Sequence, residues 1–338
     1  MHGPTDGRTF WIDVAKSVAI YLVVFSHADQ NGFTESFLFT FHVPLFYFVS
    51  GYLAKPQSDG AFLRGLARKL VLPYVYIYVV IALVSAVLLP GGDVRALPRM
   101  LAGIVYGTHS YPYFVNDAMW FLPSLITVEL LYVFCVRRLA VSYLLFLGMS
   151  YVLYRRHELD LFLSIDLSLL GLNYFLAGTL AKRFDAFRWF EGRPLRLGAL
   201  AATCIACTAA AASVGNVWYA SEHYALSLGA GLGGILMVVS VSMLLARALA
   251  GRRVARTCFT FVSSNTLFIL CFHVFSSPAA TALLAPLALG PPLTRGAATA
   301  ALSILLLVPF ILLVRRLVPE LIGLRRPAAA PPAAGPRP

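Results

Sequence analysis

Long apolar segments recur along the chain and constrain its fold more than any other feature. A helix needs roughly 20 apolar residues to cross a bilayer, and segments close to this length are separated by short polar connections. There are ten, at about 10–28, 37–54, 70–90, 118–136, 139–154, 166–181, 195–214, 224–249, 258–275 and 294–315. The pattern predicts an all-α fold, a polytopic transmembrane helical bundle of about ten spans with no appended soluble domain.

Composition agrees with this prediction. Apolar residues make up 59% of the chain and charged residues 12%, and the mean hydropathy is +0.78, whereas globular domains are about 45–50% apolar and about 25% charged.

We expect one integral-membrane domain over 1–326 and a disordered Pro/Ala-rich tail over 327–338. The first apolar run carries internal charges and no small-residue cleavage pattern follows it, so we expect no cleavable signal peptide. Segments 97–117 and 278–292 are candidates for re-entrant or interfacial structure.

Basic residues cluster between the apolar segments. Of the 27 Lys and Arg residues, 21 lie on one side of the predicted bundle and five on the other, if ten segments cross the membrane. The positive-inside rule then predicts that both termini are cytoplasmic. This distribution explains the basic balance without nucleic acid as a partner. Cys204 and Cys207 are spaced C-x-x-C inside an apolar segment, which favours core packing over a zinc site, and we expect no metal.

The first apolar segment carries three ionisable residues, Asp13, Lys16 and His27. On an α-helix each residue turns about 100°, so Lys16 and His27 lie within about 20° of each other and Asp13 about 40° from that line. Lys16 and His27 are about 16 Å apart along the axis. Because ionisable groups in a span usually face a bundle interior or a water-filled cavity, the stripe predicts a polar site along this helix.

The second segment, FHVPLFYFVSGYL, is predicted to pair with the first. The connection between them is short, so the two helices are antiparallel and His42 lies at a depth similar to that of His27. The same hairpin leads to a basic cluster on the cytoplasmic side, formed by Lys55, Arg64, Arg68 and Lys69. One end of the predicted site is therefore basic and the other holds two imidazoles.

This polarity suits a donor with an anionic head and a long arm that ends in a reactive group. Coenzyme A has this shape: Lys16, Arg64, Arg68 and Lys69 are suited to its phosphates, and its arm is of the order of the distance of about 16 Å from Lys16 to His27. A histidine there takes the proton of an acceptor hydroxyl as the oxygen attacks a thioester. Its ordinary pKa of about 6.5 leaves a neutral, basic form at neutral pH.

The motif D-x-x-K-(x)10-H in the first segment, followed by FHVPLFYFVSGYL and a basic entry to LPY, resembles the membrane acyltransferase-3 family. WFLPSL from Trp120 and the later SSNTLFILCFHVF, which contains His273, match the same layout. The variants look most similar to its fucose-O-acetylase-like and exopolysaccharide O-acetyltransferase branch. The resemblance covers about ten spans, with its specific motifs in the first 75 residues and at 120–125.

The resemblance implies an O-acyltransferase of the cytoplasmic (inner) membrane that moves an acyl group, with acetyl-CoA as the expected donor, to a sugar hydroxyl. The expected partners are membrane lipid, a glycan or lipid-linked sugar, and polysaccharide-assembly proteins. The family's histidine maps onto His27 and its basic partner onto Lys16, which is Arg in many members. The family's R-x-x-R pair is replaced by Arg64 and Arg68, spaced R-x-x-x-R with Lys69 adjacent, so which pair serves stays open.

Several residues keep two interpretations. His42 either bonds a neighbouring helix or acts as orienter or relay for His27, and His273 either closes the site or is a packed histidine. Asp13 is expected to pair with Lys16 or a nearby Arg and to position it. Glu129 is either part of the acceptor site or half of a structural pair, and Trp120 belongs to the acceptor side through its motif. The aromatic residues Tyr111, Tyr113, Trp218 and Tyr219 stack on sugar rings or form an interfacial belt.

Two functions from other classes compete with catalysis. In a secondary transporter or lipid-linked sugar carrier the charged stripe is a translocation path, but such a protein favours paired repeats and broken helices in both halves, and no such repeat is visible. The second competing function is a non-catalytic scaffold for glycan assembly.

Overall fold

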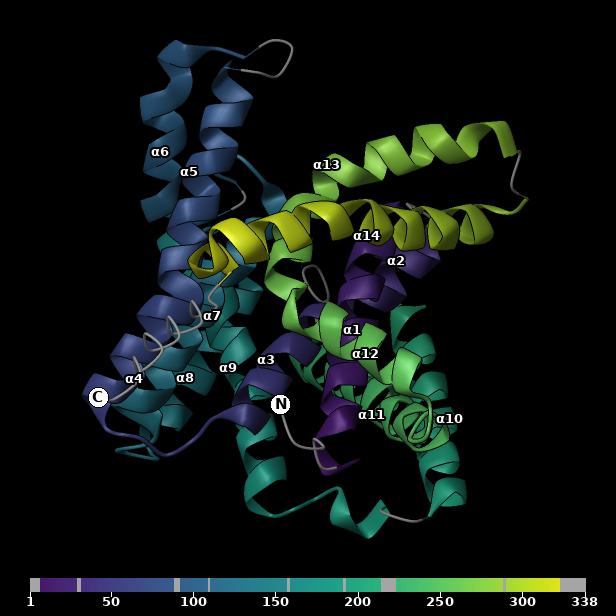
Figure 1. Cartoon of the computed structure of the whole chain (residues 1–338). Helices are drawn as coiled ribbons and strands as arrows, with labels where there is room; N and C mark the ends of the chain where they lie inside the picture. The colour runs from purple at the N-terminus through teal and green to yellow at the C-terminus, as the bar shows by residue number, and fades with distance from the viewer. Residues whose placement is uncertain are drawn as a thin grey trace, which may run out of the picture.

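The structure is a computed structural model that describes residues 7–28, 32–87, 92–108, 110–156, 159–190, 193–213, 223–287 and 290–322. This part of the chain is helical, with turns and no strands (Figure 1). Its helices are α1 (Gly7–Ala28), α2 (Gly32–Phe39), α3 (His42–Leu53), α4 (Asp59–Leu66), α5 (Leu72–Val87), α6 (Leu97–Tyr106), α7 (Phe121–Leu131), α8 (Ser142–Arg155), α9 (Ile165–Arg183), α10 (Pro194–Ala212), α11 (Tyr224–Ala248), α12 (Arg253–Ser264), α13 (Thr266–Leu284) and α14 (Pro292–Leu317). The predicted all-α bundle is confirmed, and the expected tail lies outside the described residues.

Nine helical segments of the described chain are long and apolar enough to cross a membrane. The remaining predicted span, the fifth at 139–154, corresponds to α8, whose 14 residues fall short of the roughly 20 that a bilayer needs. Its neighbours α7 and α9 run in the same direction, because Ser124 contacts Ser168 near their beginnings and Tyr132 contacts Phe175 further along both. The chain must therefore return through α8 between them, which keeps ten passages through the bundle.

The predicted ninth span is displaced in the structure. The apolar pattern placed it at 258–275, but the helix breaks at Asn265, whose φ of −121° and ψ of 17° are not helical. α12 precedes the break and carries Arg253 and Arg256, whereas the long apolar helix is α13. It continues past Pro278, so much of the predicted re-entrant segment 278–292 is helix. A proline interrupts helix hydrogen bonding, and α13 bends away from the bundle in its second half (Figure 1).

Segment 97–117 begins with α6, which folds back on α5 as a hairpin that projects beyond the other helices (Figure 1). The Tyr74 hydroxyl donates to the Ile104 carbonyl at 3.1 Å. The Tyr78 hydroxyl accepts from the Val115 amide at 3.4 Å. The hairpin is thereby fixed to the loop that leads into α7.

Small residues bring α3 against α9. A Cβ on Gly51 would lie 2.0 Å from the Phe175 carbonyl oxygen, and a Cβ on Gly178 would lie 2.0 Å from the Phe48 carbonyl oxygen. Glycine therefore permits the backbones to approach here. The Tyr47 hydroxyl also bonds the Ser124 hydroxyl at 2.6 Å, which ties α3 to α7.

The bundle has two chemically different ends. At the end where α1 finishes and α3 begins lie the imidazoles of His27, His42 and His273, and we call it the histidine end. At the opposite end, where α3 and α9 finish, Lys182 lies over the ring of Tyr52 at 5.1 Å. Because basic residues lie before, on and directly after α4 (Lys55, Arg64, Arg68 and Lys69), we call this the basic end.

Candidate active site

Three helices bring the histidines together. His27 closes α1, His42 opens α3, and His273 lies in the first half of α13. The ring centroids of His27 and His273 are 5.0 Å apart, with an angle of 43° between the ring planes. The ring of Phe39 is 6.4 Å from that of His27 and 4.8 Å from that of His42, edge-on to both. The predicted pair of imidazoles is therefore a cluster of three.

Helix carbonyls hold two of these rings. His42 Nδ1 is 2.6 Å from the Leu38 carbonyl oxygen, and His273 Nδ1 is 2.9 Å from that of Leu270. A carbonyl only accepts, so Nδ1 carries the proton in both rings and Nε2 of the neutral imidazole is an acceptor; the hydrogen-bond network thus assigns both tautomers. Both side chains are buried, with 1% and 0% exposure.

His27 differs from the other two because its side chain is exposed at the end of α1. Two carboxylates from other elements, Glu35 on α2 and Asp117 before α7, lie within electrostatic range of its ring. His27 is also an electrostatic neighbour of His42 and His273. Of the three histidines, it is the one with an exposed surface.

The segment before α7 is fixed to the helix that carries His273. The Asn116 amide donates to the Cys271 carbonyl at 2.6 Å, and its Oδ1 accepts from the Ala118 amide at 3.0 Å. Trp120 follows as a buried side chain that packs edge-on against Phe121. This connection brings the WFLPSL motif to the histidine end. Sequence reasoning missed Asn116, although an Asn that precedes a helical turn is a recognisable cap signal.

Asp13 does not form the expected ion pair with Lys16 in the described structure. Its carboxylate instead accepts hydrogen bonds from the hydroxyls of Ser263, at 2.7 Å, and Thr260, at 3.1 Å, both on α12. Lys16 is half-buried and has Asp13 as its electrostatic neighbour. Asp13 therefore fixes α12 against α1, and among the described residues the Lys16 ammonium has no hydrogen bond.

The other predicted donor contacts lie on a different part of the bundle. Arg64 is on α4, and Arg68 and Lys69 are in the π-helical turn that follows, Ala67–Val71. The apolar side of α4, Phe62 and Leu66, packs beside α7 and its continuation, in one cluster with Val133. Glu129 of α7 has Lys69 as its electrostatic neighbour, which gives this carboxylate a partner.

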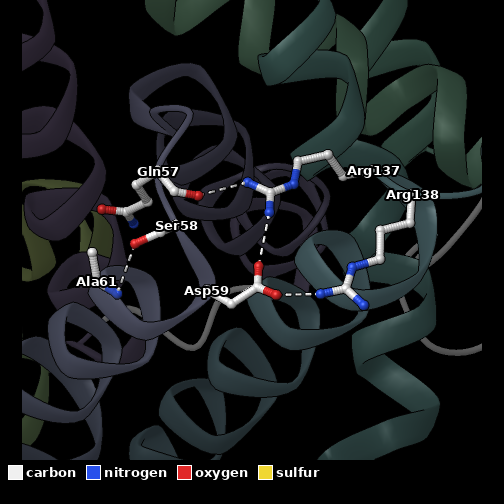
Figure 2. A network of polar contacts seen from close by, with 6 residues as sticks. All are labelled: Gln57, Ser58, Asp59, Ala61, Arg137 and Arg138. Carbon is white, nitrogen blue, oxygen red and sulfur yellow. Dashed lines mark hydrogen bonds and ion pairs between the residues drawn. The ribbon is translucent and has the colours of Figure 1, made fainter.

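A network of ion pairs and hydrogen bonds lies at the basic end (Figure 2). Asp59, the first residue of α4, pairs with Arg137 at 3.1 Å and also with Arg138. Arg137 donates to the Gln57 carbonyl at 3.4 Å as well, and Ser58 caps α4 by accepting from the Ala61 amide. Two guanidinium groups therefore share one carboxylate, so the network keeps a net positive charge.

Other polar and aromatic residues contact one another away from the histidines or lie outside the described residues. The Asn173 amide oxygen accepts from Tyr143 at 2.7 Å, and its amide nitrogen contacts Tyr224 at 3.4 Å, so it joins α8, α9 and α11. The rings of Tyr111 and Tyr113 are 6.0 Å apart beside Arg99. Trp218 and Tyr219 lie outside the described part of the chain.

Comparison with known proteins agrees with the fold and the motifs. The model of a family described as an acyltransferase domain, Acyl_transf_3, matches residues 9–314. No curated protein and no solved structure matches the chain. The match covers most of the sequence, from the start of α1 to the last turn of α14, and includes all three histidines. The chain therefore belongs to the acyltransferase-3 family and is a membrane acyltransferase.

Proposed function

We propose that the protein is an O-acyltransferase that moves an acyl group, acetyl in the simplest case, from cytoplasmic acyl-CoA to a sugar hydroxyl of a surface or exported glycan. The observation that carries this proposal is the exposed imidazole of His27, with two buried imidazoles of fixed tautomer behind it. An exposed base on a rigid support is what activation of a hydroxyl requires.

The reaction needs one base and proceeds in two proton-balanced steps. A ring nitrogen of His27 takes the proton from the acceptor hydroxyl as its oxygen attacks the thioester carbonyl carbon. The tetrahedral intermediate then expels the coenzyme A thiolate, which takes the proton from the His27 imidazolium. The products are the sugar ester and free coenzyme A, and His27 returns to its neutral form. No acyl-protein intermediate is required.

The donor enters from the basic end in this proposal. Lys16 lies on the same face of α1 as His27 at a distance of about 16 Å along the axis, and it has no hydrogen bond in the described structure, so its ammonium is available to a phosphate. Arg64, Arg68 and Lys69 form the entry from the cytoplasm, beside the positively charged network around Asp59. Phosphate groups favour such cations strongly.

The test uses membranes that contain the wild-type protein or a variant, supplied with acetyl-CoA labelled in the acetyl group. Label in the extracted polysaccharide and free coenzyme A are measured together. We expect both products from wild type and a loss of both in His27→Ala. His223→Ala, a histidine at the start of α11 outside the cluster, is the matched control and keeps activity. Coenzyme A release that survives His27→Ala unchanged would reject His27 as the base.

A further inference from the structure

His273 has a ring nitrogen without a hydrogen-bond partner among the described residues, although its side chain is fully buried. Its exposure is 0%, and Nε2 is one of a few buried side-chain polar atoms left unpaired. An unpaired buried polar atom costs free energy, and native structures rarely keep one without a reason. Because Nδ1 faces the Leu270 carbonyl at 2.9 Å, Nε2 of the neutral ring accepts a hydrogen bond and does not donate one.

The ring of His27 contacts the ring of His273. Its ring centroid is 5.0 Å from that of His273, close enough for a small side-chain rotation to join two ring nitrogens. Hydrogen bonds between catalytic groups are often loose in the free enzyme and tighten when substrate binds. His42 is placed differently, because Phe39 packs edge-on against its ring at 4.8 Å and also contacts His27.

We infer that His273, rather than His42, is the positioning residue that orients His27 during acyl transfer. His273 Nε2 accepts the N–H of one His27 ring nitrogen, which leaves the other nitrogen as the base for the acceptor hydroxyl. The chain of bonds runs from His27 through His273 to the Leu270 carbonyl, and it holds both when His27 is neutral and when it has taken the proton. This inference rests on the proposed function.

The arrangement resembles the logic of a catalytic triad, in which a buried acceptor fixes the tautomer of the histidine base. Two carboxylates compete for this role, because Glu35 and Asp117 lie within electrostatic range of His27. Asp117 is exposed and Glu35 is half-buried, so water screens and competes with both. His273 is buried and already held at Nδ1, and it therefore meets the requirement for a rigid second contact.

Two amide variants test the roles of the two His273 ring nitrogens separately. In His273→Gln the longer side chain brings an amide oxygen to the place of Nε2, whereas in His273→Asn the shorter one keeps only the contact with the Leu270 carbonyl. The labelled-acetyl assay is run at several acetyl-CoA concentrations to obtain kcat and KM. Ser276→Ala is the matched control, because Ser276 is buried one turn later on α13 and bonds Ser303 at 2.6 Å.

We expect kcat to fall about 10- to 100-fold in His273→Asn, in the range known for residues that orient a functional ligand, with KM for acetyl-CoA unchanged. His273→Gln recovers most of kcat and Ser276→Ala stays near wild type. Equal kcat values in the two amide variants, or a better Asn variant, would make His273 a structural residue and overturn the inference. A kcat loss in Asp117→Asn larger than that in His273→Asn would do so as well. Wild-type protein without transfer would instead reject the proposed function itself.

Discussion

The two ends of this bundle use polar residues in opposite ways. At the histidine end His42 and His273 are buried, and a helix carbonyl holds one nitrogen of each ring. At the basic end Arg64 on the eight-residue α4 and Lys69 in the π-helical turn are exposed, Arg68 is half-buried, and Arg137 and Arg138 share one carboxylate. Proton transfer requires atoms fixed within a fraction of an ångström. Binding a flexible polyanion requires mainly positive charge.

The comparison predicts that a change at the histidine end removes catalysis and leaves donor binding intact. In His27→Ala we expect kcat to fall by about 10²–10⁴, the range for a lost general base, because the acceptor hydroxyl then keeps its proton. Calorimetric titration of the purified protein with acetyl-CoA should give the same Kd as for wild type. A weaker Kd in the variant would place the donor head near His27 and break the division into two ends.

The close approach of α3 to α9 supports both ends, so a change there should affect the whole bundle. In Gly178→Ala the new Cβ meets the Phe48 carbonyl oxygen, and we expect the free energy of unfolding to fall by about 1–3 kcal/mol, as overpacking does. Gly148→Ala on α8 is the matched control, because a Cβ there has nothing within 4 Å. Thermal unfolding in detergent measures both. Equal midpoints for the two variants would show that α3 and α9 adjust freely.

For Lys16, in the half of α1 that leads from the basic end, we expect a change in affinity without a change in chemistry. Lys16→Gln should raise KM for acetyl-CoA about tenfold, since a charge-assisted hydrogen bond contributes about 1.5–3 kcal/mol, while kcat stays near wild type. Lys16→Arg keeps the charge and should keep KM. Lys182→Gln is the control, because Lys182 is exposed and lies over the Tyr52 ring. A fall in kcat with an unchanged KM would move Lys16 from donor binding to the reacting groups.

The sequence predicts the bundle and the two histidines of the first hairpin well, because apolar length and helical spacing are local properties. The contact of His27 with His273 is not local: it depends on the break at Asn265, which moves the long helix of the ninth span toward the C-terminus. A polar run at 263–266 marks this break, but it is too short to separate two spans by apolar length alone. The bridge from Asn116 to Cys271 leaves no local pattern, because it is a long-range hydrogen bond.

For the cations, the sequence predicts the side of the membrane but not the packing partners. Their positions follow from the positive-inside rule, but the rule does not say which helices they share. α4 packs beside α7 because Phe62 and Leu66 form an apolar side on this short helix, and the basic turn with Lys69 follows directly. Lys69 therefore lies near Glu129. Asp13, expected to pair with Lys16, satisfies its carboxylate with hydroxyls on α12, a partner that charge pattern alone does not reveal.

The smallest effect should come from the exposed network of the basic end. Asp59→Asn removes the carboxylate that Arg137 and Arg138 share, and because these side chains are 31–55% exposed we expect a loss of only about 0.2–1 kcal/mol. The loss should shrink in high salt, where the Debye length falls to about 3 Å at 1 M. Thermal unfolding in detergent at low and high salt measures the difference, with Asp93→Asn, an exposed aspartate that caps the 3₁₀ turn Val94–Ala96, as the control. A large, salt-independent loss would mean that water does not reach the network, and the basic end would then be as preorganised as the histidine end.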